Sequence, residues 1–459
     1  MIDRKLSIIP FAVLILINVL ALVLTANPAS FSTAEINAGD TAWMLAASGL
    51  VLLMTPGLAF FYGGMVNAKN VISTMFQSFM AMAVVSVLWV VVGFSLAFGD
   101  SIGGFVGNPL TFPFFNGVMD GAPWSLAPTV PLMLFAVFQL KFGIITPALI
   151  TGAFAERIKF VSYTLFIVLW SLLIYAPLAH WTWHPDGFLF KLGVLDFAGG
   201  TVVHMSAGWA ALASAMYLKQ RKTYQEQIVH PPANVPYVLL GTGLLWFGWF
   251  GFNAGSAFGA NGLAASAFAT TNTASAAAGL AWILFDAVKG KKPSALGFCI
   301  GAVVGLVAIT PAAGFVTLPA SIFIGTAAGL VSNFVAHLRS KTNLDDTLDV
   351  FPCHGVGGMV GMLMTGIFAT PAVNAALAPE GAEPIKGLFY GGVGLFVSHL
   401  IALVAVSAFA FLGSFAILKL TDLISPLRVP ASEETDGLDL SQHDESIVYN
   451  TLVEEKTPV

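Results

Sequence analysis

Two histidines set inside apolar runs are the residues of this sequence best suited to chemistry. His204 follows Asp196 by eight positions in LDFAGGTVVH, and His354 follows Asp346 by eight positions in DTLDVFPCH. A neutral imidazole can donate or accept a hydrogen bond and pass a proton, and an ionisable ring within a bilayer is costly enough to suggest a function. The alternative for each ring alone is a hydrogen bond between helices. The pair favours a duplicated fold that turns both rings toward one shared interior.

Aromatic and hydroxyl side chains fall at helical spacing in two other apolar runs. Phe138 and Phe142 are four positions apart, and Trp249, Phe252 and Ser256 follow one another at intervals of three and four, so each set shares a helix face. An aromatic face attracts a cation by about 0.5–2 kcal/mol, and a serine oxygen accepts a hydrogen bond from an N–H donor. In a chain with 38 Phe most rings are packing residues, which is the alternative for each of these.

Trp183, in the loop stretch AHWTWHPDGF, offers a further aromatic face. The chain has neither a ring of acidic residues for a bare metal cation nor the carbonyl filter motif of potassium channels. No third His or Cys stands at ligand spacing from the histidine pair, which argues against an intramembrane metalloenzyme. We therefore expect no metal and no cofactor. The residue types favour a small cation that carries N–H groups and can shed a proton.

The composition is that of a membrane protein built from helices. Of 459 residues, 57% are hydrophobic and only 9% are charged, whereas about 25% would be charged in a soluble protein. Many apolar runs reach about 20 residues, the length that spans a bilayer. The 46 Gly lie largely within these runs and indicate close helix packing. With only Cys299 and Cys353, a disulfide framework is not expected, and nothing indicates binding of nucleic acid.

The first residues have the layout of a secretory signal peptide. Arg4 and Lys5 precede an apolar run, Leu6 to Leu24, and small polar residues follow it. We predict a signal peptide over residues 1–34, with cleavage after Ala26, Ala29 or Ala34. The alternative is an uncleaved first helix, because the run is nearly long enough to span the membrane.

Eleven further spans are expected in a transmembrane domain over residues 40–420. Their predicted bounds are 42–63, 71–99, 130–153, 161–181, 201–218, 236–257, 262–287, 295–313, 318–338, 352–370 and 388–418. Alternate loops hold eleven Lys and Arg, and the loops between them hold two, so the mature N-terminus is expected outside and the C-terminus in the cytoplasm. Spans one to five and six to ten form two halves, and an odd number per half makes the repeat an inverted one.

Residues 421–459 are expected to form a cytoplasmic tail. After Arg428 the tail has eight acidic residues and one basic residue, Lys456. Such an end is usually solvated and disordered. Its Pro, Gly and spaced apolar residues leave an ordered regulatory segment as an equal alternative.

Several long segments together resemble the ammonium transporter (Amt/Mep/Rh) family. They are FYGGMVNAKN, FQLKFGIITPALITGAFAERIKF, LDFAGGTVVH, GWFGFNAGSA, ITPAAGF, DVFPCHGVGG, TGIFA and LRVP…GLDLSQHDE…YN. The resemblance covers about residues 40 to 450, and the motifs are long and specific. It is similar in particular to the bacterial Amt branch, through its full set of Phe, Trp and Ser residues and its tail.

The resemblance implies a path with a recruitment site, a gate and a dry pore. The recruitment site for ammonium at the outer mouth would comprise Phe138, Trp183 and Ser256, with Asp196 near it. The gate and lining beyond it would comprise the stacked Phe142 and Phe252, the twin histidines His204 and His354, and Trp249 and Thr310. In this interpretation Asp196 orients backbone and favours cation entry electrostatically, without ligating the cation directly, and Asp346 is structural.

Lys141 needs a place in this scheme, because it stands between Phe138 and Phe142. By helix geometry it points about 60° from Phe138 and about 100° from Phe142 around the axis. We therefore expect its side chain to leave the pore for a helix contact or to snorkel outward. A lysine that faced the path would repel a cation.

The family resemblance also implies an assembly and partners. Family members are homotrimers with one pore per subunit in the cell (inner) membrane, and many are plugged from the cytoplasm by a PII-type signal protein. The expected substrate is ammonium or ammonia, with methylammonium as an analogue. A neutral gas channel and an ammonium sensor that transports little are the alternatives.

Overall fold

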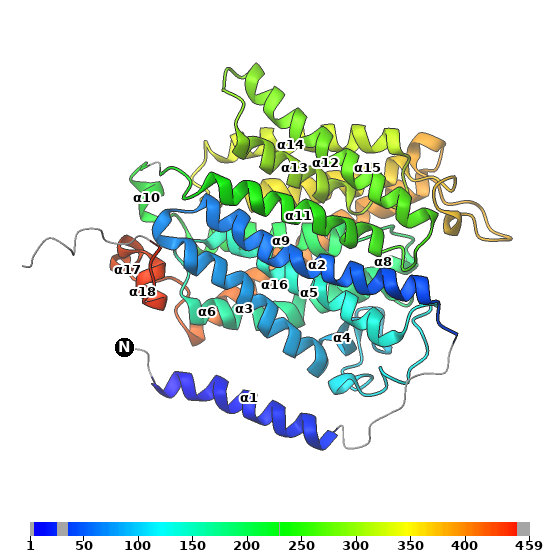
Figure 1. Cartoon of the computed structure of the whole chain (residues 1–459), viewed down its shortest axis with the longest axis horizontal. Helices are drawn as coiled ribbons and strands as arrows, with labels where there is room; N and C mark the ends of the chain where they lie inside the picture. The colour runs from blue at the N-terminus through cyan, green and yellow to red at the C-terminus, as the bar shows by residue number, and fades with distance from the viewer. Residues whose placement is uncertain (1–3, 25–34, 229, 448–459) are drawn as a thin grey trace, which may run out of the picture.

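Long helices lying side by side make up the molecule (Figure 1). The structure is a computed structural model that describes residues 4–24, 35–228 and 230–447. Helix α1 (Arg4–Leu24) lies apart from the bundle, alongside α3 and α4, and its apolar side chains from Ile8 onward are largely exposed. The apolar run predicted at this end is therefore helical. The predicted cleavage positions after Ala26, Ala29 and Ala34 lie outside the described residues, and the signal peptide stays a prediction.

Each of the eleven expected spans falls on a helix or on a run of consecutive helices. These are α2 (Ala38–Met65); α3 (Val71–Leu88), η2 (Trp89–Gly93) and α4 (Phe94–Phe98); α5 (Leu132–Phe154); α6 (Phe160–Trp170), η4 (Ser171–Tyr175) and α7 (Ala176–Trp183); η5 (Gly200–Met205) and α9 (Ser206–Leu218); α11 (Val235–Gly255); α12 (Gly262–Val288); α13 (Ala295–Ile309); α14 (Leu318–Arg339); η6 (Phe351–Val356) and α15 (Gly357–Phe368); and α16 (Val393–Ile424). Within the described residues, eight of these segments are long and apolar enough to cross a membrane, and α13 is a shorter apolar helix. The helical membrane fold is confirmed, and the count of eleven crossings stays a prediction.

Short elements connect these helices. They are η1 (Ala68–Asn70), the hairpin strands β1 (Ser101–Ile102) and β2 (Val106–Gly107), η3 (Pro113–Phe115), α8 (Phe188–Lys191), α10 (Lys222–Gln225), η7 (Ala375–Leu377), η8 (Leu388–Tyr390), α17 (Ala431–Asp436) and α18 (Leu438–His443). We call the end of the bundle that holds α17 and α18 the tail end, and the opposite end the Trp183 end.

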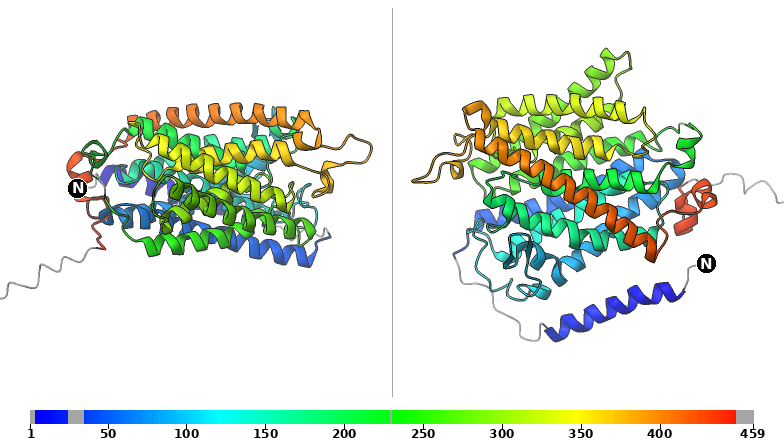
Figure 2. Two further views of the ribbon diagram at one scale, coloured as in Figure 1. Left: turned by 90° about the horizontal axis from the view of Figure 1, so that it is seen from above. Right: turned by 180° about the vertical axis from the view of Figure 1, so that it is seen from behind.

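Small residues let the long helices approach closely. Along α2 and α11, a Cβ atom added to Gly241 would lie 2.3 Å from the backbone nitrogen of Phe61, closer than a side chain can come. Helix α16 crosses the other helices obliquely and runs nearly the full length of the bundle (Figure 2). It packs against α9 and α15, which come from different halves of the chain.

The segments that carry the two histidines repeat each other after 150 residues. Both η5 and η6 are π-helical, with one extra residue per turn. Gly199 and Asp349 precede them with positive φ angles of 122° and 55°. The carbonyl of Gly199 accepts from the nitrogen of Val203 at 2.9 Å, and that of Asp349 accepts from Cys353 at 3.0 Å.

Each π-helical segment also touches the α-helix that continues the other one, η6 touching α9 and η5 touching α15. A Cβ on Gly208 would lie 2.1 Å from the nitrogen of Gly355, and a Cβ on Gly358 would lie 3.1 Å from the nitrogen of Met205. Position 208 therefore meets 355 as position 358 meets 205. Such reciprocal contacts are what a two-fold relation between two halves produces.

The described part of the tail contains two short helices, α17 and α18, that pack on the bundle. Both carboxylate oxygens of Asp439 accept backbone hydrogen bonds at the start of α3, from Ser73 at 2.8 Å and from Ile72 at 3.1 Å. The ring of His443 packs edge-on against Phe160, with centroids 4.7 Å apart. The ordered alternative thus describes α17 and α18, and a regulatory role stays a prediction.

Charged side chains at the tail end tie distant loops together. Arg221 donates to Glu156 at 2.7 Å and to Asp345 at 2.9 Å, and the buried Arg157 donates to the carbonyl of Asp345 at 2.7 Å. Burial opposes ionisation of Asp345, but the hydrogen bonds and charge of Arg221 hold its pKa below the usual range. The loop that leads into η6 is thereby anchored to loops from the first half of the chain.

Candidate functional site

Trp183 is held in place by the turn that precedes η5. It ends α7, and its indole nitrogen donates to the carbonyl of Asp196 at 3.0 Å. Its ring stands edge-on to Phe142, with centroids 5.7 Å apart, and stays partly accessible. A rigid aromatic face is therefore offered at the Trp183 end of the bundle.

The carboxylate of Asp196 caps η5. One oxygen accepts from the backbone of Gly199 at 2.7 Å and of Gly200 at 2.6 Å. The other accepts from the backbone of Thr201 at 2.7 Å and from its hydroxyl at 2.5 Å. With 7% of Asp196 exposed and four donors bound, neither oxygen is left open to ligate a cation. Its charge still faces the helix N-terminus, where anions are favoured.

Gly199 makes this cap possible. Its φ of 122° lies where side chains are strained, and an added Cβ would come within 2.6 Å of the side chain of Val203. The pair of glycines in LDFAGGTVVH is thus part of how Asp196 reaches the start of η5.

Three phenylalanine rings follow one another inward from the Trp183 end. Phe138 and Phe142 meet edge-on at 4.9 Å, and Phe142 lies over Phe252 at 4.2 Å with an interplanar angle of 31°. All three are essentially buried, whereas Lys141 on the same helix keeps a partly accessible side chain. The hydroxyl of Ser256 donates to the carbonyl of Phe252 at 2.9 Å, which leaves its oxygen lone pairs available.

The two histidines meet beyond these rings. The Nδ1 atoms of His204 and His354 are 3.3 Å apart, and the rings lie 23° from parallel with centroids at 5.4 Å. Trp249 stacks on His204 at 5.3 Å, and its indole nitrogen donates to the hydroxyl of Thr310 at 2.8 Å. The buried Nε2 of His204 has no hydrogen-bond partner within the part of the chain that the structure describes. That atom is therefore available for a hydrogen bond to a ligand.

Asp346 occupies the place of Asp196 in the second half. One of its oxygens accepts from the backbone nitrogen of Phe351 at 2.7 Å, as Asp196 does from Thr201. Its other oxygen is buried and has no hydrogen-bond partner among the described residues. The two aspartates therefore share a position and differ in how fully they are bonded.

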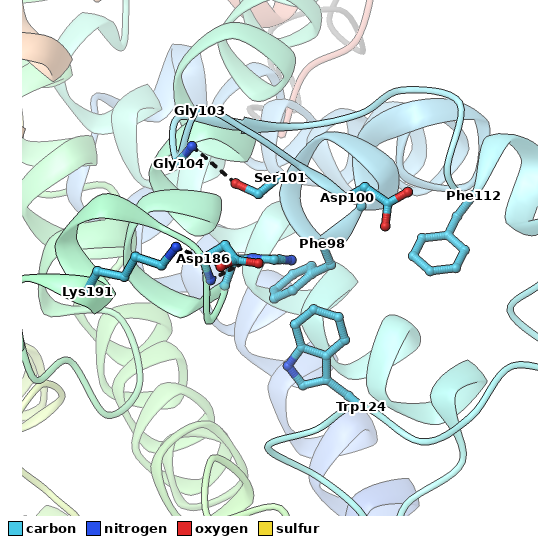
Figure 3. Close-up of a pocket in the computed structure, with 11 residues that line it drawn as sticks. Phe98, Asp100, Ser101, Gly103, Gly104, Phe112, Trp124, Asp186 and Lys191 are labelled. Atoms are coloured by element: carbon cyan, nitrogen blue, oxygen red, sulfur yellow. Dashed lines mark hydrogen bonds and ion pairs between the residues drawn. The ribbon is translucent and has the colours of Figure 1, made fainter.

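A polar pocket of about 550 Å³ opens beside this site at the Trp183 end (Figure 3). On its wall Lys191 pairs with Asp186 at 2.7 Å, and the ring of His184 stands edge-on to Trp124 at 5.3 Å. Trp124 in turn stacks on Phe135. The sequence interpretation had not singled out this pocket, because its residues come mostly from loops and from the ends of two different helices, with no common helical spacing.

Two further side chains near the site were also missed. Phe258 lies 6.0 Å from Phe138 and just follows the predicted Ser256, so its place in the segment NAGSAF was the available signal. His399 is a further buried histidine within an apolar run, FVSHLIALV, and that setting alone could have marked it. Within the described ranges, no three His, Cys, Asp or Glu side chains gather as metal ligands.

Comparison with known proteins agrees with this arrangement. The model of the Ammonium Transporter Family matches residues 42–448. The chain belongs to the ammonium transporter family. It is 47% identical over 417 residues to an ammonium transporter of Bacillus subtilis, covering 90% of this chain and 99% of the relative. An ammonium transporter of Aquifex aeolicus is 46% identical over 421 residues, covering 91% and 95%.

Solved structures of ammonium transporter family members share the fold. The crystal structure of Saccharomyces cerevisiae Mep2 superposes with a TM-score of 0.81 at 36% identity, covering 87% of this chain and 89% of that one. A structure titled Sensor Amt Protein gives a TM-score of 0.79 at 28% identity, covering 88% and 98%. The family expectation is confirmed, and with it a multi-pass membrane protein that is a transporter and not an enzyme.

Proposed function

We propose that the protein carries ammonium across the cell membrane by separating it into ammonia and a proton. The cation is first held at the Trp183 end by the faces of Trp183 and Phe138 and by the oxygen of Ser256. It loses its proton near Phe142 and Phe252. Ammonia then crosses along the histidine pair, and the proton follows separately.

One observation carries this proposal: the stacked phenylalanines join the mouth to the histidines without a break. Phe142 touches Trp183 on one side at 5.7 Å, and Phe252 touches His204 on the other at 6.0 Å. The Phe142 and Phe252 rings themselves are 4.2 Å apart. Any solute that goes from Trp183 to His204 has to displace these rings, and it leaves its water behind as it does so.

The physics of the path favours deprotonation. A charge in a low-dielectric passage is penalised, so the pKa of an enclosed ammonium falls and the neutral form is favoured. Before that point, aromatic faces contribute about 0.5–2 kcal/mol each, and a hydrogen bond to Ser256 replaces one to water. The site is therefore suited to a cation with N–H groups that can give up a proton. Potassium has no proton to give up, so it is not expected to pass.

The surroundings belong to the same proposal. The Trp183 end faces outside and the tail end faces the cytoplasm, since the Lys-rich loops lie with the tail. The protein acts as a homotrimer with one pore per subunit in the inner membrane, accepts methylammonium as an analogue, and presents its tail end to a PII-type regulator. Thr310, which holds Trp249, lines the path beside His204.

Currents from liposomes on a solid-supported membrane test the mechanism. An ammonium jump gives a transient current in the wild type. Ser256→Ala raises the half-saturating ammonium concentration about tenfold, because the charged donor loses a hydrogen bond. His204→Asp abolishes either the current or the selectivity over potassium. If His204→Asp kept both, proton transfer through the histidines would be wrong.

Two alternatives give different results in the same preparation. A neutral gas channel would take up labelled methylamine or ammonia without a current. An ammonium sensor, as the likeness to Sensor Amt Protein raises, would show no uptake in a transporter-deficient strain while its signalling remained intact. The higher identity to ammonium transporters supports transport.

A further inference from the structure

His399 is a buried histidine that the path does not contain. It lies on α16 with none of its surface exposed. Its Nε2 is 3.1 Å from the backbone nitrogen of Leu195, and its Nδ1 is 2.6 Å from the carbonyl of Met362. A backbone N–H only donates and a carbonyl only accepts, so the hydrogen of the ring sits on Nδ1. Both ring nitrogens are then used, and the ring is neutral.

The two partners of His399 belong to the two halves of the site. Leu195 directly precedes Asp196, whose carbonyl holds Trp183 and whose carboxylate caps η5. Met362 lies in α15, which continues the π-helix that carries His354. One imidazole therefore joins the turn before His204 to the helix after His354.

The same two segments also pack directly against each other beside this ring. A Cβ on Gly200, in the first turn of η5, would lie 3.0 Å from the sulfur of Met362. The contact fixes the distance between the segments but not their relative sliding, since a thioether makes no directional bond with a glycine. The two hydrogen bonds of His399 are directional and set that register.

We propose that His399 is a positioning residue for transport. Its neutral ring sets the register between the Asp196 turn and α15, and through it the 3.3 Å contact between the pore histidines. The inference rests on the proposed function only for its effect on transport. The geometric part concerns the histidine pair itself.

Two substitutions distinguish the effect of the hydrogen bonds of His399 from the effect of its side-chain volume. His399→Leu fills the space and removes both hydrogen bonds. His399→Gln keeps one donor and one acceptor on a side chain that reaches both partners. Ser398→Ala is the matched control, because Ser398 is the neighbour on α16 and donates to the carbonyl of Leu192 at 2.8 Å on the exposed side.

Nitrogen-15 solid-state NMR of histidine-labelled full-length protein reads the geometry without transport. His399, assigned by the signals lost in His399→Leu, shows a neutral ring protonated at Nδ1. In His399→Leu the signals of the His204 and His354 pair shift, and they stay in place in His399→Gln and Ser398→Ala. Unchanged pair signals in His399→Leu would overturn the proposal, whether or not ammonium is transported.

Currents from the same preparations give the functional half. Per mole of folded protein, His399→Leu lowers the maximum ammonium current about tenfold, and His399→Gln lowers it less than about threefold. A purely structural role would lower only the yield and leave the current per folded molecule unchanged, which would overturn the proposal. If His399→Leu does not fold, His399→Asn replaces it, since its shorter amide reaches one partner only. A wild type without current would reject transport and leave the NMR result to decide on positioning.

Discussion

The segments that carry His204 and His354 share a backbone and differ in their surroundings. Each has an aspartate eight positions earlier, a positive φ five positions earlier and a π-helical turn at the histidine. Asp196 binds four donors, whereas Asp346 binds the backbone of Phe351 and has one oxygen without a hydrogen-bond partner among the described residues. The duplicated backbone thus places both rings, and the side chains around it make the two ends different.

The two segments also differ in the charged side chains around them. At the tail end, Arg339 pairs with Asp349 at 2.7 Å, beside the Arg221 and Asp345 pair. Burial raises the pKa of Asp349 to about 6, against the opposing charge of Arg339. At the Trp183 end, the equivalent position is Gly199, which has no side chain to ionise. The difference teaches that a repeat can keep its geometry while one copy gains a further titratable group, here Asp349 in place of Gly199.

The largest effect is expected at the reciprocal glycine contacts, which test whether the two halves pack against each other as described. Gly208→Ala would put a Cβ 2.1 Å from the nitrogen of Gly355, and neither backbone can give way. We expect almost no monodisperse protein by size-exclusion chromatography. Gly358→Ala meets its neighbours at 3.1 Å and loses only a few degrees of melting temperature. Gly243→Ala, with open space around it, is the control, and equal yields of Gly208→Ala and Gly243→Ala would contradict the packing.

The two aspartates come next. Asp196→Asn presents an amide to donors that need an acceptor, and we expect ammonium uptake to fall at least about 100-fold, which corresponds to about 3 kcal/mol. Asp346→Asn disturbs one bonded oxygen and lowers uptake about tenfold or less. Labelled methylammonium uptake measures both, with the exposed Asp120→Asn as control. Equal losses of uptake in Asp196→Asn and Asp346→Asn would contradict the proposed difference between the two aspartates.

A tryptophan lies beside each π-helix, Trp249 beside η5 and Trp209 beside η6, and substitutions of the two test whether both matter equally for transport. Trp249→Leu removes the ring that stacks on His204 and its bond to Thr310, and we expect the maximum current to fall about tenfold. Trp209→Leu removes a ring that packs edge-on against Phe351 and Phe411, and the current should change less than about twofold. A larger loss at 209 than at 249 would reverse the assignment.

The smallest expected effect is on pH dependence. The folded pKa of Asp349 is raised to about 6, so its contribution to stability is present at low pH and is lost as pH rises through 6. The melting temperature of the wild type relative to Asp349→Asn should fall by about 2–4 °C between pH 5 and 7.5. Asp120→Asn should show no such trend. A flat difference for Asp349→Asn would place the titrating charge elsewhere.

Hydropathy predicted the helices well because a bilayer demands long apolar runs. The span predicted at 318–338 is α14 (Leu318–Arg339). The predicted bounds were wrong where the end of an apolar run does not coincide with the end of the helix. The span predicted at 388–418 is α16, Val393–Ile424. Gly391, with a φ of 85°, delays the start, and the helix continues past Lys419 because a charged residue ends the apolar run and not the helix. Likewise α13 ends at Ile309, just before Pro311, and not at 313.

Side-chain spacing predicted which residues gather, and backbone detail lay beyond it. The faces of Phe138 with Phe142 and of Trp249 with Phe252 followed from intervals of three and four. A π-turn adds one residue without changing the residue types, so η5 and η6 left no mark in the pattern. The apolar run around His399 could have marked the residue, but its partners lie 204 and 37 positions away, and no spacing rule predicts them.

His204 and His354 face each other through the same atom, Nδ1. When both rings are neutral, only one hydrogen fits between two identical atoms, so one ring gives it and the other takes it. The hydrogen bond within this duplicated pair is therefore asymmetric. It can run in either direction, with His204 or His354 as the donor. Going from one direction to the other relocates hydrogens on both rings. The pair therefore has two hydrogen-bonded states, which differ in the direction of this one bond.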